Sequence, residues 1–254
     1  MKLLRTWTII EMTLRQLFRR QITLILLIVI PTVFFLVVYY TTTDRIVPFK
    51  LATVSETTMI EVSERSESLV FIGVAAVGFL ASFLALNLVQ KNAIVHRRMV
   101  LCGYRSWEIF AALFFVLLIM VTLLAIYVST ALNLFFDLNN AYGVFLGMFA
   151  AGMVYGSYGL LSGIIIRGEL EGILLIVLLA NIDAGWLQNP LFYEGAQNKE
   201  FIRYLPAWFP SQVSLTGAFT DHLFSKSLFY SMVYGFGLLG TGLLFYIFKM
   251  RIFR

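Results

Sequence analysis

The side chain with the clearest potential for chemistry is the carboxylate of Asp183, which interrupts an otherwise apolar run from Gly172 to Tyr193. Asn181 lies two residues before it, and both lie within 11 residues of Gly172. If a helix begins at Gly172, a rise of about 1.5 Å per residue places these side chains about halfway across a bilayer. An ionisable residue at that depth is costly and predicts a functional site.

Two other interpretations of Asp183 stay open. A helix that begins earlier, near Glu169, would lift Asp183 to the headgroups on the far side of the membrane. Asp183 would also serve a structural role if it paired with Arg203 or Lys199. A proton relay usually needs a second acid or a histidine in the membrane, and the sequence offers only this carboxylate.

A basic segment at residues 91–108, with sequence KNAIVHRRMVLCGYRSWE, is the second candidate site. It is too rich in apolar residues for a solvated loop. A short helix here would turn its apolar side to the bilayer or to a partner, and its cations toward phosphates or acids. Alternatively, its charge only fixes the topology of the chain. The candidate contact residues are His96, Arg97, Arg98, Tyr104 and Arg105.

The motifs of familiar active sites are missing from the sequence. It contains no GxxxxGK[ST] phosphate loop, no HExxH or GxSxG motif, and no Cys/His cluster with metal-binding spacing. The two histidines, His96 and His222, are predicted on opposite sides of the membrane. We therefore expect no enzymatic activity, no metal and no cofactor in this chain itself.

The composition identifies the elements that must position these residues. Of 254 residues, 60% are hydrophobic and 13% are charged, whereas about a quarter of a soluble domain is charged. This excludes a soluble enzyme and a disordered tail, and the single Cys102 excludes a disulfide scaffold. A net charge of +5 indicates basic cytoplasmic loops rather than a nucleic-acid partner.

Runs with few or no charged residues predict six membrane-spanning helices, each of about 20 residues. The runs are Gln21–Thr43, Ser68–Gln90, Ile109–Phe136, Leu138–Ile166, Gly172–Tyr193 and Ser227–Phe248. About two-thirds of the Lys and Arg residues fall on one side, so the positive-inside rule predicts that both termini are cytoplasmic. The expected fold is an all-α, multi-pass protein of the plasma or inner membrane, with one domain over residues 1–254.

Residues 1–20 are predicted to form an amphipathic helix that lies along the membrane surface. Its basic side chains lie largely off an apolar stripe with helical spacing. The helix would serve as a basic anchor or contact a cytoplasmic partner. The stripe consists of Leu4, Trp7, Ile10, Leu14, Leu17 and Phe18.

Small residues recur at four-residue spacing in the fourth predicted span, which lets another helix approach closely. These are Gly152, Gly156, Gly159 and Gly163. They predict close helix packing within the chain or, alternatively, a subunit interface.

Aromatic residues gather near one membrane surface. Phe34 and Phe35 follow Pro31 in the first span, and Trp186 precedes the aromatic segment 190–226. They would form an interfacial belt or line an exit for a hydrophobic substrate.

Taken in order along the chain, these features resemble the permease subunits of type-2 ABC exporters over almost the whole length. A basic amphipathic helix precedes a span that contains Pro31, and the basic loop HRRMVLCGYRSWEIF joins the second and third spans. The charged turn RGELE joins the fourth and fifth spans, and YLPAWFPSQVSLTGAF precedes the last one. The sequence departs from the family because residues 91–98 lack the usual acidic residue.

The resemblance implies a complex of two permeases with two cytoplasmic ABC ATPases, which bind ATP and Mg. Residues 91–108 would act as the coupling helix through His96, Arg97, Arg98, Tyr104 and Arg105. Segment 190–226 would fold as a re-entrant helical hairpin. The substrate path would follow a permease dimer interface lined by the first, second and fifth spans, which hold Pro31, Phe34, Phe35, Asn181, Asp183 and Trp186.

We therefore expect a subunit that exports an amphipathic or hydrophobic compound by alternating access. A drug, an antibiotic, a peptide or a lipid-linked polymer would fit, and the compact chain favours drug or peptide efflux. One alternative is a secondary transporter that uses an ion gradient through Asp183. Another is a membrane anchor without transport, in which Arg97, Arg98 and Arg105 dock a partner.

Overall fold

The computed structural model describes residues 2–51, 59–166, 168–189, 192–193 and 197–251. Within these ranges, six helical segments are long and apolar enough to cross a membrane, as predicted. They are α2 (Gln21–Thr41), α3 (Glu64–Gln90), α5 (Ser106–Phe135), α6 (Ala141–Ile165), α7 (Glu169–Ile182) extended by the π-helical turn η1 (Asp183–Leu187), and α11 (Ser225–Arg251). This composition indicates a multi-pass membrane protein.

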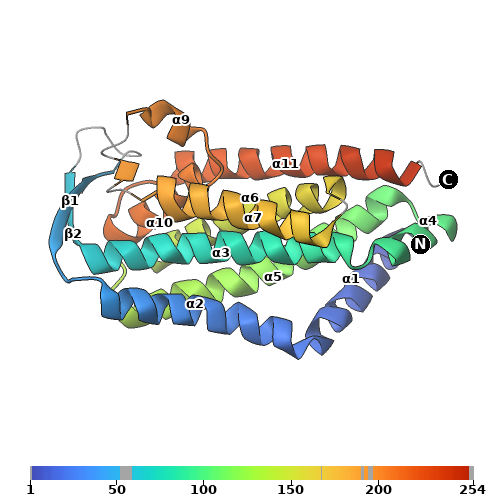
Figure 1. Cartoon of the computed structure of the whole chain (residues 1–254), viewed down its shortest axis with the longest axis horizontal. Coiled ribbons are helices and arrows are strands. Elements are labelled where there is room, and N and C mark those ends of the chain that lie inside the picture. Colours follow the sequence, from blue (N-terminus) through green and yellow to red (C-terminus); the bar gives the residue numbers. More distant parts are fainter. Residues whose placement is uncertain (1, 52–58, 167, 190–191, 194–196, 252–254) are drawn as a thin grey trace.

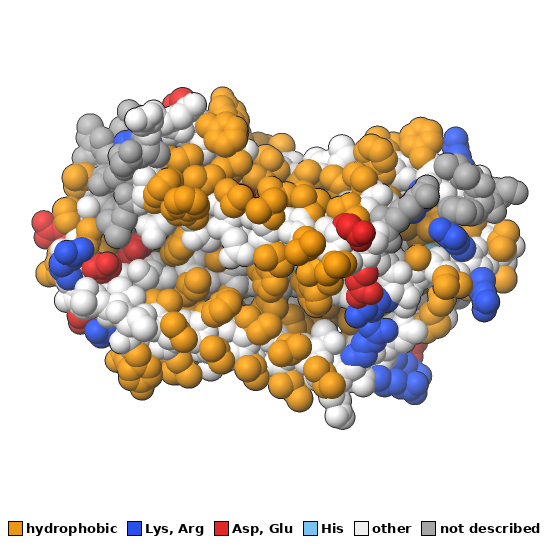
Figure 2. Space-filling view, viewed as in Figure 1, with side chains coloured by type: hydrophobic (Ala, Val, Ile, Leu, Met, Phe, Trp, Pro, Cys, Tyr) orange, Lys and Arg blue, Asp and Glu red, His pale blue; other side chains and the backbone are white. Residues whose placement is uncertain are grey.

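Shorter elements lie at the two ends of this bundle. They are α1 (Lys2–Arg19), α4 (Ala93–Leu101), α9 (Lys199–Arg203), α10 (Trp208–Phe219) and the strands β1 (Ile46–Lys50) and β2 (Met59–Ser63). Figure 1 shows α4 and both termini at one end, here called the terminal end, and the strands with α9 at the other, here called the hairpin end. Charged side chains gather toward these ends, and hydrophobic side chains cover most of the middle (Figure 2).

Helices α3 and α6 form the centre of the bundle. In their most hydrophobic stretches, 78% and 72% of the residues are buried, compared with 11% in α2 and 22% in α11. Helix α6 contacts α3, α5, α10 and α11, so it holds the bundle together. The peripheral helices present their apolar side chains outward, as expected where the surroundings are lipid or another subunit.

The close packing of α6 depends on glycine. Gly152 and Gly156 face side chains of α5, and Gly159 and Gly163 face α3. A Cβ atom at Gly159 would overlap the backbone carbonyl of Ser82, so only glycine fits between these two helices. All four glycines singled out in the sequence therefore pack against helices of the same chain.

The hairpin end holds structure that hydropathy did not predict. β1 and β2 pair in antiparallel register between α2 and α3, with Ile46 opposite Ser63. Helix α3 begins at Glu64, one turn before the charge-free run at Ser68. Glu64 and Glu67 occupy its first turn, where carboxylates interact favourably with the helix dipole.

Helix α1 meets α2 at Arg20, where the chain changes direction (Figure 1). Ile9, Ile10 and Leu17 are buried in a cluster that includes residues of α3, α4 and α5. Trp7 lies on the exposed side of the same helix. The amphipathic pattern therefore gives α1 one side that packs on the bundle and one side that faces outward.

Candidate functional site

Asp183 lies where α7 changes from an α-helix to a π-helical turn. Helix α7 begins at Glu169 and runs for 14 residues, so it is the earlier of the two starts considered for this helix. At about 1.5 Å per residue, Asp183 lies about 21 Å from that start, or about two-thirds of the way across a bilayer core. Single π-helical turns within helices occur frequently at functional sites.

The carboxylate of Asp183 is only 3% exposed and accepts three hydrogen bonds. Tyr155 Oη donates to Oδ2 at 2.5 Å, Gln188 Nε2 to Oδ1 at 2.9 Å, and the backbone N–H of Ala207 to Oδ2 at 2.9 Å. These three neutral donors come from α6, the end of η1 and the start of α10. The Asp183 site, defined by these four residues, therefore joins three elements.

The basic residues that were considered as partners of Asp183 make other contacts. Arg203 donates to Tyr193 Oη at 3.0 Å and to a carboxylate oxygen of Glu200 at 3.2 Å. The ammonium of Lys199 lies 5.6 Å from the centre of the Tyr193 ring. Both cations therefore help to order the segment around α9.

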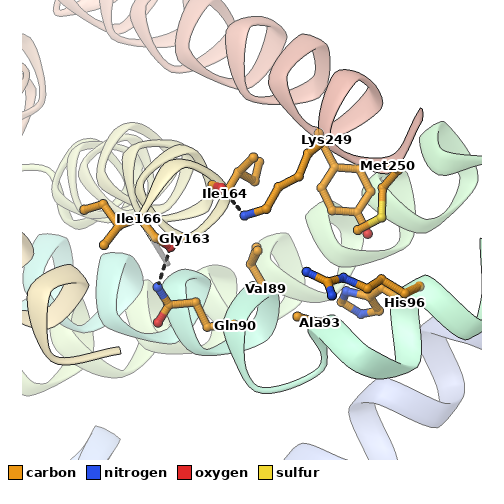
Figure 3. Close-up of a pocket in the computed structure, with 11 residues that line it drawn as sticks. Val89, Gln90, Ala93, His96, Gly163, Ile164, Ile166, Lys249 and Met250 are labelled. Atoms are coloured by element: carbon orange, nitrogen blue, oxygen red, sulfur yellow. Dashed lines mark hydrogen bonds between the residues drawn. The ribbon is translucent and has the colours of Figure 1, made fainter. Parts of the chain in front are cut away.

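The second site is a cavity of about 510 Å³ at the terminal end, called here the terminal pocket. It lies among α3, α4, α6 and α11, and Gln90, His96 and Lys249 extend into it from three of them (Figure 3). The Lys249 ammonium donates to the carbonyl of Ile164. Gln90 Nε2 donates to the carbonyls of Ile166 at 3.1 Å and Gly168 at 3.3 Å, so both long side chains cap the end of α6.

His96 is buried in the wall of this pocket, with 3% of its surface exposed. Its ring lies across that of Tyr246, with centroids 6.5 Å apart and planes at 70°. Burial lowers the pKa of His96 from 6.5 to about 4, so the imidazole is neutral near pH 7. In the described part of the chain, His96 Nδ1, Tyr246 Oη and Gln90 Oε1 are buried without a hydrogen-bond partner.

The opposite side of α4 and the turn that follows it form an exposed surface, called here the α4 surface. It is defined by Ile94, Arg98 and Leu101 of α4 and by Arg105, the residue before α5. Ile94 and Leu101 are 68% and 71% exposed, and both arginines are also exposed. Val100 is buried in the core and holds the helix on the bundle. Two apolar side chains are thus presented between cations at the terminal end.

The structure divides the predicted coupling residues into two groups. Arg97, Arg98 and Arg105 are exposed, whereas His96 is buried beside the terminal pocket, which Arg97 also lines. Tyr104 is half-buried, and the guanidinium of Arg5 lies 5.6 Å from the centre of its ring. Only the three arginines are therefore placed to touch a partner directly.

The residues predicted along a substrate path lie in different environments. Pro31 and Phe35 are buried, and the Phe35 ring packs 5.9 Å from that of Phe135. Phe34, Asn181 and Trp186 are exposed on α2, α7 and η1. The path residues therefore do not form one cluster, although α2 and α7 both pack against α3.

Six residues of the two sites discussed above were missed in the sequence. Tyr155, Gln188 and Ala207 surround Asp183, and Gln90, Tyr246 and Lys249 line the terminal pocket. Gln188 lies five positions after Asp183, and residues five apart come together in a π-helical turn. The other five belong to long-range contacts that no local pattern reveals.

Comparison with known proteins leaves the function to be inferred from this geometry. Among the residues that the structure describes, no three or more His, Cys, Asp or Glu side chains are grouped to hold a metal ion. A scan against models of protein families gave no match, and a search among curated proteins gave no match either.

Proposed function

We propose that this chain is the membrane-spanning permease subunit of an ATP-driven exporter of the type-2 ABC class, which its sequence resembles. It would move an amphipathic or hydrophobic compound out of the cell, with a separate cytoplasmic ATPase as the source of energy. The observation that carries the proposal is the α4 surface, a short basic and apolar helix face between two membrane-spanning helices.

The α4 surface has the composition of a protein-docking site. Ile94 and Leu101 lie seven residues apart and so project from the same side of the helix. Exposed apolar residues beside arginines are typical of the cores of protein interfaces. Arg98 and Arg105 would meet acidic side chains at the edge of the partner, so the partner expected here is a protein with an apolar groove bordered by carboxylates.

The attachment of α4 to the bundle suits the transmission of movement. His96 and Val100 are buried beneath the helix, and Val100 belongs to the same core cluster as Leu88 of α3 and Leu113 of α5. Because a packed core deforms little, a displacement of α4 would move α3 and α5 with it. In this proposal, closure of the ATPase thereby changes the balance between two states of the bundle.

Helix α10 supports the re-entrant segment of the proposed fold. Its first end is joined to Asp183 through the N–H of Ala207, and its last carbonyls accept from the turn between α5 and α6. Asn140 N–H donates to Gly217 at 2.9 Å and Asn139 N–H to Ala218 at 3.2 Å. A helix of 12 residues spans about 18 Å, so we infer that α10 returns from within the membrane to the hairpin end. Residues 190–191 and 194–196 of this segment lie outside the described chain.

The face made by α2, α3 and α7 is the proposed interface with a second permease. Helix α3 lies between the other two (Figure 1), and α2 and α7 are largely exposed in their most hydrophobic stretches. Asn181 places a polar amide on the exposed side of α7, where contact with lipid would be unfavourable. A second copy or a sibling permease would cover this amide, and the substrate would pass between the two chains.

The first experiment is purification of the chain from its native membrane in mild detergent, with mass spectrometry of its partners. We expect an ATPase that contains a phosphate loop, in equal amount to the permease. Leu101→Asp should release that ATPase and abolish ATP-driven transport, whereas Leu223→Asp, an exposed leucine near the hairpin end, should not. Recovery of the chain without an ATPase, even after crosslinking, would contradict the proposal.

The secondary-transport alternative makes the opposite prediction in vesicles. If Asp183 were an ion site, the purified chain would transport in the absence of ATP when an ion gradient is imposed. Asp183→Asn would then abolish transport without changing the stability of the bundle. In the exporter proposal, no transport occurs without the ATPase, and Asp183 acts only by holding α10 in place.

A further inference from the structure

Helix α1 exposes apolar side chains that its packing on the bundle does not explain. Ile9, Thr13 and Leu17, at four-residue spacing, are the side of the helix that is buried against the bundle. Trp7 and Phe18 are 65% and 52% exposed. They lie about three helical turns apart, so both project from one common side, which differs from the buried side.

A third side of α1 is basic. Arg15 and Arg19, four residues apart, project together and are both exposed. Arg15 bonds at 2.6 Å to Glu11, the one acidic residue of α1, but a guanidinium carries five donors and can bind a further acceptor. The guanidinium of Arg5 is directed to the bundle instead, 5.6 Å from the centre of the Tyr104 ring. Arg15 and Arg19 are therefore the cations that α1 offers outward.

Trp7, Phe18, Arg15 and Arg19 together define the α1 outer surface, which lies where the chain enters the membrane. Arg20 alone separates α1 from α2, a helix long and apolar enough to cross a bilayer. Because such a helix begins at the level of the lipid headgroups, the end of α1 also lies there. Ile22 is 76% exposed and continues the apolar exposure of Phe18 into α2. Figure 1 shows α1 leaving the start of α2 and running toward the terminal end.

Charge and position together identify the partner of this surface. A helix with Trp and Phe on one side and arginines on another is typical of helices that lie in the membrane interface. Tryptophan is enriched at the headgroup level, and arginines there attract anionic lipids. A soluble protein would have to cover Phe18 and Ile22 at the point where the membrane begins. The lipid layer itself is therefore the partner that the surface fits.

We propose that the α1 outer surface binds the headgroup layer of a bilayer that contains anionic phospholipid. Trp7 and Phe18 would enter the boundary between headgroups and acyl chains. Arg15 and Arg19 would bind lipid phosphates through charge-assisted hydrogen bonds. The three sides of α1 would thus face the bundle, the acyl chains and the headgroups. This inference does not depend on an ATPase partner or on transport.

The test measures which lipids touch α1 in the full-length chain, reconstituted in phosphatidylcholine. A fluorophore is attached at Trp7→Cys in a chain whose own exposed cysteine is removed by Cys102→Ser. Its quenching is compared for phosphatidylglycerol and phosphatidylcholine that carry a nitroxide near the glycerol, each added as a minor component. We expect phosphatidylglycerol to be enriched about fivefold at this position, which is the effect of one arginine near an anionic surface.

Matched controls isolate the contribution of α1. Phe115→Cys places the same fluorophore on the exposed side of α5, where both lipids should quench equally. Arg15→Gln combined with Arg19→Gln should abolish the enrichment at the α1 position. Arg98→Gln combined with Arg251→Gln removes the same charge from exposed residues of α4 and α11 and should leave the enrichment unchanged.

Because Arg15 also pairs with Glu11, Arg19→Gln alone is the second variant, and it should lower the enrichment without changing the melting temperature. Equal quenching by the two lipids at the α1 position, or enrichment that survives the loss of both arginines, would overturn the proposal. Quenching at Phe115→Cys with none at the α1 position would assign the surface to water or to a soluble protein, and would also overturn it. Enrichment that is lost only with the arginines of α1 would establish the lipid contact.

Discussion

The Asp183 site and the terminal pocket are both buried and polar, but the first closes around one carboxylate and the second surrounds a cavity of about 510 Å³. Asp183 has three donors from the protein at 2.5–2.9 Å. Around the pocket, atoms of His96, Tyr246 and Gln90 lie buried without partners in the described chain. The Asp183 carboxylate, whose two oxygens are both bonded within the chain, holds three elements together, whereas the residues around the pocket leave a cavity between four helices.

The two sites are connected by one helix. Tyr155 belongs to the Asp183 site and Ile164 to the terminal pocket, and both lie on α6. The pocket also touches α4, whose outer side is the proposed surface for the ATPase. We therefore expect damage to the Asp183 site to lower the stability of the bundle, whereas damage to the pocket should change mainly how that stability depends on pH.

The largest effect is expected from Asp183→Ala. The change leaves Tyr155 Oη, Gln188 Nε2 and the Ala207 N–H buried without their acceptor, which should cost about 4 kcal/mol of unfolding free energy. Reversible unfolding in mixed micelles would measure the loss. Asn181→Ala, two residues away on the exposed side of α7, is the control and should cost little. A loss no larger than that of the control would show that Asp183 is not an anchor.

The next largest effect concerns the close packing of α6, the helix shared by the two sites, against α3. Gly159→Ala would press a methyl group against the backbone of Ser82 in α3 and should cost about 3 kcal/mol, the upper end for overpacking. Gly240→Ala is the matched control on α11, because its Cβ would enter open space. We expect Gly159→Ala to lower the melting temperature and Gly240→Ala to leave it unchanged or slightly higher. Equal melting temperatures of the two variants would show that the close contact of α6 and α3 at Gly159 does not limit stability.

A smaller effect should appear when His96 is protonated. The pKa of His96 is about 4 in the folded chain and 6.5 in its ordinary state, so the unfolded chain takes up the proton first as the pH falls. Stability from this residue is complete above about pH 6.5 and falls toward pH 4. Between pH 7.5 and pH 5 the loss is about 2 kcal/mol.

Melting curves at several pH values would measure this loss, and His96→Gln should flatten the dependence. Loss of hydration on burial is the cause of the lowered pKa of His96, and Arg97 and Lys249 line the same cavity. A pH dependence that survives in His96→Gln would assign it to another group.

The sequence predicted the spans better than it predicted the sites. Hydropathy located all six long helices, because a membrane requires about 20 apolar residues in each. It missed β1 and β2, since two short strands depend on pairing with each other rather than on composition. It placed His96 with the exposed arginines, because the spacing of a nine-residue helix does not show which side the bundle covers. Asp183 was recognised as a costly residue, but its donors from α6 and α10 are 28 and 24 positions away.

The smallest effect is expected when only one of the three hydrogen bonds to Asp183 is removed. Tyr155→Phe removes a single hydroxyl and leaves the donors Gln188 and Ala207 on the carboxylate, so the loss should be about 1 kcal/mol. Tyr158→Phe, a half-buried tyrosine one turn along α6, is the control for removal of a phenol. Asp183→Ala already breaks the hydrogen bond of Tyr155. If the stranded hydroxyl costs nothing, Tyr155→Phe combined with Asp183→Ala should therefore be as stable as Asp183→Ala alone. A double variant more stable than Asp183→Ala would show that the stranded Tyr155 hydroxyl carries part of the cost, as expected for a buried donor that has lost its acceptor.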